Sequence, residues 1–129
     1  LIHYLGFLLM IEIDKDLKQF YTSFLNRLKM LTDENCPGKT WIENGHHCFC
    51  EFEEMCMKFM SPCESILKWS TLRDDQRLDL QKLYEMLIEY DSNEKTDDEI
   101  CNDPEWHKIR KLAKKVYVDL KNVKFISIN

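Results

Sequence analysis

Apolar residues recur at intervals of three and four over most of the chain, which is the spacing of one face of an α-helix. The clearest case is residues 14–31, where seven apolar positions fall on one face: Leu17, Phe20, Tyr21, Phe24, Leu25, Leu28 and Leu31. Asp14 or Asp16 is expected to cap this helix, because a carboxylate accepts hydrogen bonds from the free N–H groups of the first turn. The pattern therefore predicts a helix over 14–31.

The helical spacing resumes at Phe49 and continues to Met60. Ser61-Pro62-Cys63-Glu64 then combines a capping box with a proline at the first helical position, and both are signals of a helix start. We therefore expect a separate short helix over 62–69, with Ile66 and Trp69 buried.

Two further helices are predicted in the second half of the chain. The first covers about 72–91, and its expected apolar face comprises Leu72, Gln76, Leu80, Leu83, Tyr84 and Leu87. Its other faces carry charges that we expect to be exposed, at Arg73, Asp74, Arg77, Asp79, Lys82 and Glu85. The second begins at Asp103-Pro104, a cap residue followed by proline. Its buried stripe is predicted to be Trp106, Ile109, Ala113, Val116, Tyr117 and Leu120.

The connections and the termini are distinct in composition. Residues 32–47 are rich in turn formers and 91–103 are polar and acidic, so both are predicted to be loops. Residues 1–13 are apolar, but they lack a cationic start, and acidic residues follow where a signal-peptide cleavage site would lie. We expect them to form a core element, whereas residues 123–129 would form either a short strand or a docked end of the chain.

Length and composition set the fold class. The 129 residues include 44% hydrophobic residues and only 3 Gly and 3 Pro, which suits one domain with a substantial core. No uncharged apolar stretch is long enough to span a membrane, so no membrane partner is expected. The sequence predicts an all-α domain over 1–129, a compact bundle of about five or six helices.

Six cysteines stand at positions 36, 48, 50, 56, 63 and 101. A domain of this size is stable without disulfides, and Cys48 and Cys50 are closer together than in an ordinary secreted framework. We expect reduced thiols in a cytoplasmic protein, behaving as small buried hydrophobes.

Metal binding and catalysis have partial signals in the sequence. A small zinc-binding regulator would use His46, Cys48 and Cys50 with Cys36 or Cys56, but no second ligand pair completes a tetrahedral set. Cys50 as a nucleophile would have its pKa raised by Glu51, Glu53 and Glu54. No phosphate loop or hydrolase motif occurs. We therefore expect no metal, no cofactor and no enzyme activity.

Charge is segregated along the chain, whose net charge is -5. Between residues 89 and 105 a single base, Lys95, stands among the acids Glu89, Asp91, Glu94, Asp97, Asp98, Glu99, Asp103 and Glu105. The bases that follow are Lys108, Arg110, Lys111, Lys114, Lys115, Lys121 and Lys124. A solvated loop beside a basic helix face would show this pattern. So would an acidic docking surface for a cationic protein, whereas direct nucleic-acid binding is disfavoured by the negative charge.

The region 61–120 resembles small all-helical immunity proteins of bacterial contact-dependent growth inhibition systems. The resemblance rests on the pattern of Leu67, Trp69, Leu72, Gln76, Leu78, Leu83, Tyr84 and Leu87, an acidic loop, then Asp103, Pro104, Glu105, Trp106, Ile109 and Ala113. It implies a cytoplasmic inhibitor that binds a cognate toxin, commonly a nuclease with a cationic active site.

The residues predicted to contact the partner come from the charge pattern alone. They are Glu89, Asp91, Glu94, Asp97, Asp98, Glu99, Glu51, Glu53 and Glu54. A helical adaptor or inhibitor that acts on a host protein is the alternative.

Overall fold

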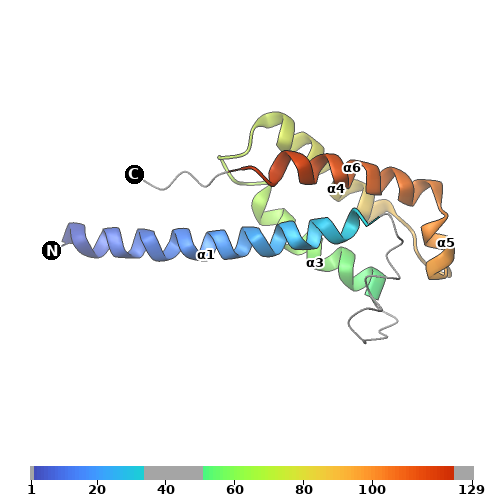
Figure 1. The fold of residues 1–129 in the computed structure, drawn as a ribbon, viewed down its shortest axis with the longest axis horizontal. Coiled ribbons are helices and arrows are strands. Elements are labelled where there is room, and N and C mark those ends of the chain that lie inside the picture. The colour runs from blue at the N-terminus through green and yellow to red at the C-terminus, as the bar shows by residue number, and fades with distance from the viewer. Residues whose placement is uncertain (1, 34–50, 124–129) are drawn as a thin grey trace.

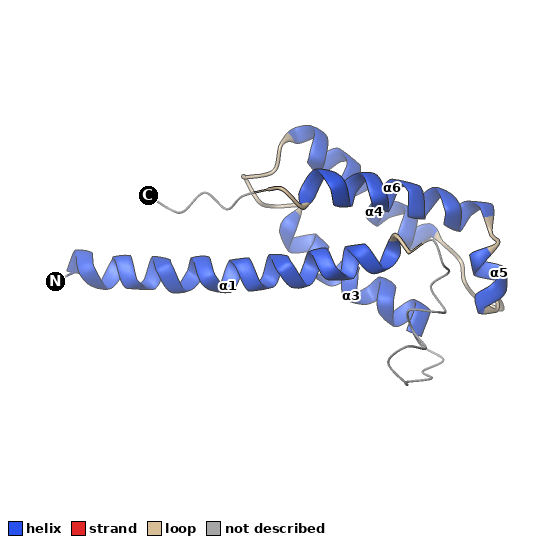
Figure 2. Ribbon diagram, in the orientation of Figure 1, coloured by secondary structure: helices blue, strands red, loops and turns tan. Residues whose placement is uncertain are grey.

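The computed structural model describes the backbone of residues 2–33 and 51–123, with side chains described from residues 15 and 52 onward in these two parts. Every regular element of these residues is a helix, which confirms the all-α prediction (Figure 2). The helices are α1 (Ile2–Leu31), α3 (Glu51–Ile66), α4 (Asp74–Glu89), α5 (Asp97–Cys101) and α6 (Pro104–Leu120). The predicted loop over 34–47 and the strand or docked end expected after residue 123 lie outside the described residues.

Four helices enclose the core. α1 packs against α3 and α6, and α4 packs against the same two helices (Figure 1). The rings of Phe24 on α1 and Phe59 on α3 are stacked with their centroids 5.3 Å apart, and both side chains are fully buried. The Tyr21 hydroxyl donates to the Leu120 carbonyl at 2.6 Å. This bond joins α1 to α6, and it gives a second donor to the Leu120 carbonyl, which also accepts from the Val123 N–H at 3.1 Å.

The apolar faces predicted for α4 and α6 are the faces that the structure buries. Gln76, Leu80, Leu83 and Leu87 are buried on α4. The α6 stripe is buried at every predicted position except Tyr117, which is half-buried. Trp69 is also half-buried and packs against the core. The helical period therefore located the core within these two helices correctly.

The first helix begins earlier than the predicted start near Asp14. The apolar residues 2–13 continue α1 toward the N-terminus, and this half of the helix projects beyond the other described helices (Figure 1). Their side chains lie outside the described part of the chain, so their expected place in the core stays a prediction.

The predicted break at Ser61-Pro62 is wrong, because α3 continues through Pro62 to Ile66. A proline inside a helix has no N–H for the carbonyl four residues earlier, which here belongs to Lys58. The Arg27 guanidinium on α1 supplies the missing donor, with Nη1 2.9 Å from the Lys58 carbonyl oxygen. A contact between helices thus compensates for a local signal that favours termination.

The prediction that residues 91–103 form a loop throughout is also wrong, because they contain the short helix α5. The Thr96 hydroxyl caps it by accepting from the Glu99 N–H at 3.2 Å. Thr96-x-x-Glu99 is the spacing of a capping box, and Ile100 is only 3% exposed. A single buried isoleucine therefore anchors an otherwise polar segment.

Arg77 was expected among the exposed charges of α4, and the structure corrects this. Its side chain is half-buried, and its guanidinium donates to the carbonyls of Leu67, Trp69 and Leu72. These carbonyls lie at the end of α3 and in the connection to α4, where intrahelical donors are missing. Arg77 therefore holds the α3–α4 connection closed.

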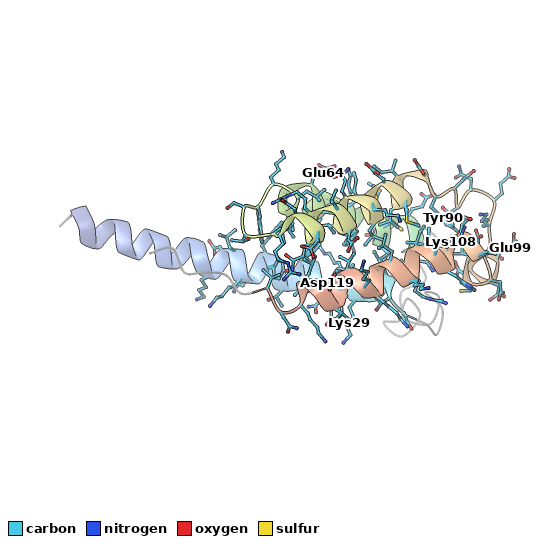
Figure 3. The ribbon with its side chains drawn as sticks, turned by 90° about the horizontal axis from the view of Figure 1, so that it is seen from above. Lys29, Glu64, Tyr90, Glu99, Lys108 and Asp119 are labelled. Atoms are coloured by element: carbon cyan, nitrogen blue, oxygen red, sulfur yellow. The ribbon has the colours of Figure 1, made fainter. Side chains whose placement is uncertain are left out.

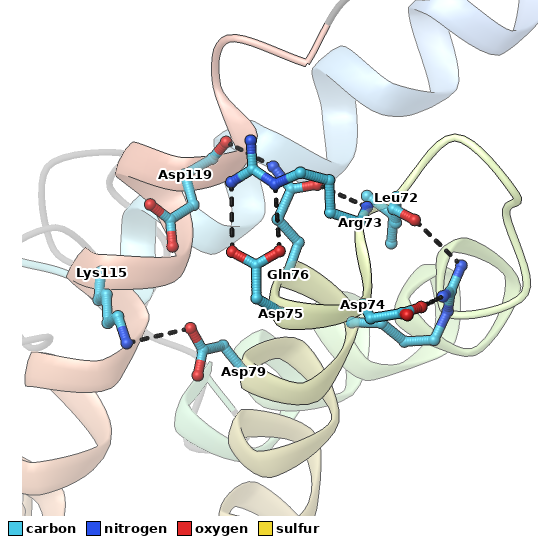
Figure 4. A network of polar contacts seen from close by, with 9 residues as sticks. Leu72, Arg73, Asp74, Asp75, Gln76, Asp79, Lys115 and Asp119 are labelled. Carbon is cyan, nitrogen blue, oxygen red and sulfur yellow. Dashed lines mark hydrogen bonds and ion pairs between the residues drawn. The ribbon is translucent and has the colours of Figure 1, made fainter.

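A second polar group joins the start of α4 to the end of α6. Gln76 accepts from the Arg73 N–H at 2.9 Å and donates to the Asp119 carbonyl at 3.3 Å (Figure 4). Lys115 of α6 pairs with Asp79 of α4 at 3.2 Å. Both contacts set the position of α6 along α4.

Candidate functional site

Six exposed carboxylates gather where α4 ends and α5 begins, and we call this surface the acidic end. Its members are Glu89, Asp91, Glu94, Asp97, Asp98 and Glu99. Figure 3 shows Tyr90, Glu99 and Lys108 together at this end of the molecule, far from the projecting half of α1. The six residues predicted from this stretch of the chain are all exposed, and they stand on the segment that runs from the last residue of α4 to α5.

A cluster of aromatic rings supports the acidic end. Trp106, which is fully buried, lies 4.9 Å from Phe52 and 5.5 Å from Tyr90 between ring centroids. The three rings come from α6, α3 and the end of α4. They tie together the three segments on which the acidic end rests.

One carboxylate in this region, Asp103, forms hydrogen bonds and an ion pair within the fold itself. It accepts from the Lys95 ammonium at 2.7 Å and from the Tyr90 hydroxyl at 2.8 Å, and it caps α6 through the Glu105 N–H. These bonds, with Lys95 the largest contribution, lower the pKa of Asp103 to about 2. Burial is the main cause that raises the pKa of Tyr90, and the bond to Asp103 adds to it. Asp103 is therefore a charged structural residue and not part of the free acidic surface.

The six members of the acidic end form no ion pair within residues 15–33 and 52–123. Lys95 forms an ion pair with Asp103. Two lysines of α6 form ion pairs with acids that are not members of the acidic end. Lys108 pairs with Glu105 at 3.1 Å, and Lys115 pairs with Asp79. In the described residues, the lysines of α6 therefore form no resolved ion pair with the acidic end.

Several of these acids also have a local role. Asp97, Asp98 and Glu99 occupy the first turn of α5, where the helix dipole favours negative charge. Asp91 accepts from the Asn93 N–H at 2.9 Å. Glu94 has none of these roles and adopts a left-handed backbone with φ 64°, which is the conformation that suits glycine or asparagine. A glutamate there keeps a negative charge at a conformational cost.

The acids at the start of α3 stand on a different helix from the six members of the acidic end. Glu53 is exposed, and Glu54 pairs with Lys58 at 3.2 Å. Both line an open depression of about 600 Å³ between α3 and α1, together with Arg27 and Met57. The side chain of Glu51 lies outside the described residues. Glu53 and Glu54 therefore line a depression beside α1, whereas the six members of the acidic end stand on the segment from the end of α4 to α5.

The three described cysteines differ in oxidation state. Cys56 and Cys63 are free thiols buried in α3, as predicted, and burial raises the pKa of each to about 12. Cys101 is disulfide-bonded, which contradicts the prediction that it is reduced. Its partner is not among the described cysteines. The pairing of distant thiols depends on tertiary contacts that cysteine spacing does not reveal.

Metal binding is not supported within the described part of the chain, where no three potential ligands converge. Of the predicted zinc ligands, Cys36, His46, Cys48 and Cys50 lie outside it, and Cys56 is a buried thiol. The alternative nucleophile, Cys50, is outside it as well. None of the described helices is long and apolar enough to cross a bilayer.

No known protein family, curated protein or solved structure matches this chain. The similarity to immunity proteins therefore stays a prediction, and the argument for function rests on the surface itself.

Sequence reasoning missed the residues that support this surface. Asp103 was predicted as a cap and as one acid of the segment 89–105, but not as the acceptor of Lys95 and Tyr90. One signal was available, because Lys95 is the only base among the acids between residues 89 and 105. A lone cation in such a segment has a strong electrostatic preference for one of its acidic neighbours.

Proposed function

We propose that this protein is an inhibitor that binds the cationic surface of another protein through its acidic end, with a toxin of the nuclease type as the leading target. The observation that carries the proposal is the set of six exposed carboxylates left without an ion pair on a scaffold fixed by Phe52, Tyr90 and Trp106. The target class follows from the resemblance of residues 61–120 to immunity proteins.

Electrostatics explains why such a surface suits a nuclease. A nuclease must hold phosphates, so its active site is lined with cations. Carboxylates that lie close together act jointly on such a surface, because the screening length is about 8 Å at physiological salt. They accelerate encounter and favour one orientation of the two proteins.

Affinity also needs an apolar contact, and Ile88 provides a candidate. It lies in the last turn of α4 next to Glu89 and is 56% exposed. Binding energy concentrates on a few anchors that become buried, with charges around them. We expect Ile88 to slow dissociation and the acids to speed association.

The first test measures binding kinetics with a purified toxin domain encoded beside this chain's own gene. Asp97→Lys with Asp98→Lys should lower the association rate at low salt about tenfold or more, and far less at high salt. The matched control is Asp16→Lys with Asp74→Lys, which makes the same change in net charge at two exposed positions outside the acidic end. Equal effects of the two variants, or no complex with the wild type, would contradict the proposal.

A substitution of Ile88 separates the two contributions. Ile88→Ser should raise the dissociation rate with little dependence on salt, because an apolar contact is not screened by ions. An effect of Ile88→Ser on the association rate alone would assign the anchor to some other residue.

The Cys101 disulfide favours a second candidate, an inhibitor or adaptor that acts on a host protein in an oxidising compartment. Disulfides persist outside the reducing cytosol. Trapping of thiols in producing cells, followed by mass spectrometry, distinguishes the two. A Cys101 that is reduced in the cell supports the cytoplasmic toxin inhibitor, and an oxidised one supports action on a host protein.

A further inference from the structure

One side of α6 carries bases and no acid. Lys115 marks the side toward α4, because its ammonium pairs with Asp79. Both acids of α6 lie on that side, since Asp119 stands one turn from Lys115, and Glu105 stands about four turns from Asp119. The helical period places three bases on the other side, toward α1: Arg110, Lys114 and Lys121.

Two lysines of α1 extend this basic surface across to the neighbouring helix. Arg27 marks the side of α1 toward α3, because it donates to the Lys58 carbonyl. Lys29 lies two residues further on, about 200° around the helix, and Lys18 lies about three turns before Lys29. Both lysines are therefore on the side away from α3 and toward α6, and Figure 3 shows Lys29 beside α6.

These bases, with Lys111 beside Arg110, form a surface that we call the basic face. Its members are Lys18, Lys29, Arg110, Lys111, Lys114 and Lys121, of which Arg110 and Lys114 are half-buried and the others are exposed. Apart from Lys114, none of them forms an ion pair with another described residue. Asp33 adds one acid at the end of α1. A protein of net charge -5 thus carries a concentrated positive surface.

The acidic end has the opposite charge and also lacks ion pairs within the described side chains. The two surfaces form no ion pair with each other there, and α6 stands between α4 and the basic face. A helix with its side chains is about 10 Å across, which exceeds the screening length of about 8 Å at physiological salt. The two surfaces are therefore better placed to neutralise each other between molecules than within one.

We propose that the basic face binds the acidic end of a second copy of this chain, in a weak two-fold dimer. A two-fold axis lets each copy provide both surfaces, so one pairing makes two equal contacts. The negative net charge opposes association, but distant charges are screened, whereas the opposite charges that face each other at the contact remain attractive. An interface of exposed charged side chains is weak and sensitive to salt.

The dimer covers the surface that we propose for target binding. As a regulator of inhibition, it rests on the proposed function. A target would have to displace the second copy, so the dimer holds the inhibitor inactive at high concentration and releases it on dilution.

Sedimentation equilibrium of the purified chain at low and high salt tests self-association directly. The wild type should form dimers at low salt, and the dissociation constant should rise about tenfold or more at high salt. A wild type that stays monomeric at low salt, or a dimer that does not respond to salt, would overturn the proposal.

Reversing charge on the acidic end separates local complementarity from net charge. Asp97→Lys with Asp98→Lys makes the protein less negative, which would strengthen any association governed by net charge. We expect the opposite, a dissociation constant raised about tenfold or more, because the basic face of the second copy then meets like charges. A strengthened or unchanged dimer would contradict the proposal.

The basic face has its own variant and a matched control. Lys111→Glu with Lys121→Glu should weaken the dimer, whereas Lys68→Glu with Lys82→Glu makes the same change in net charge at two exposed positions outside the basic face. Equal effects of the two variants would overturn the assignment of the basic face.

Mixing the two charge-reversed proteins gives the decisive result. Neither should dimerise alone at low salt, but an equimolar mixture should form a heterodimer, because each reversed surface again meets the opposite charge. A mixture that stays monomeric refutes the proposal. Should the acidic-end variant fail to fold, the salt dependence and the basic-face variants still decide. A wild type that stays monomeric and binds a short DNA duplex through Lys111 and Lys121 would assign the basic face to nucleic acid instead. Because no target is required, failure of the dimer is distinguishable from failure of the proposed function.

Discussion

Arg27 and Pro62 are expected to be coupled through one carbonyl group, although they lie on different helices. Pro62 deprives the Lys58 carbonyl of its helical donor, and Arg27 Nη1 replaces that donor at 2.9 Å. The perturbation is Arg27→Met, which removes the guanidinium and keeps an apolar stem. It is made in the wild type and in Pro62→Ala, where residue 62 regains an N–H.

The size of the effect follows from the environment of the bond. A hydrogen bond to a charged donor contributes about 1.5–3 kcal/mol when it is buried. The Arg27 bond is exposed to solvent, and water can replace part of it, so we expect Arg27→Met to lower the free energy of unfolding by about 1 kcal/mol. In Pro62→Ala the loss should be less than half of that, because the helix supplies its own donor.

Urea unfolding of the four proteins of this double-mutant cycle, followed by circular dichroism, measures the coupling. The cost of losing the buried Pro62 ring cancels within the cycle. Lys18→Met is the control, because Lys18 is an exposed cation of the same helix and no contact of its side chain is resolved. The reasoning is refuted if Arg27→Met lowers the free energy of unfolding by the same amount in the wild type and in Pro62→Ala, to within about 0.3 kcal/mol.

Three further predictions concern single side chains. Tyr21→Phe removes one of the two donors to the Leu120 carbonyl, the other being the Val123 N–H, and should lower the free energy of unfolding by about 1 kcal/mol. A loss near zero would show that the Tyr21 bond contributes nothing. Arg77→Lys should lower the free energy of unfolding by about 1–2 kcal/mol, because one ammonium cannot reach the carbonyls of Leu67, Trp69 and Leu72 together. A variant as stable as the wild type in urea would contradict this role of Arg77. Since folding lowers the pKa of Asp103 to about 2 from its usual 3.8, its contribution to stability is complete above pH 4 and is lost as the pH falls from about 4 to 2. Thermal unfolding between pH 5 and 2 should show a shallower decline for Asp103→Asn, and identical slopes would exclude this linkage.

Much of the candidate site could be predicted from the sequence, because its acids are neighbours along the chain. Glu89, Asp91 and Asp97–Glu99 had to lie near one another wherever this segment folded. Their freedom from ion pairs could not be predicted, since the lysines of α6 stood equally available to neutralise them. The structure pairs Lys108 with Glu105 and Lys115 with Asp79 instead.

The sequence by itself determined the helices, their buried faces and the cap at Asp103, because these depend on residues within one or two turns of each other. Tertiary structure decided three other features: the continuity of α3 through Pro62, the burial of Arg77 and the bonded state of Cys101. Each depends on a group supplied by a distant part of the chain. Local spacing carries no information on such distances, since only the packed core brings those groups together.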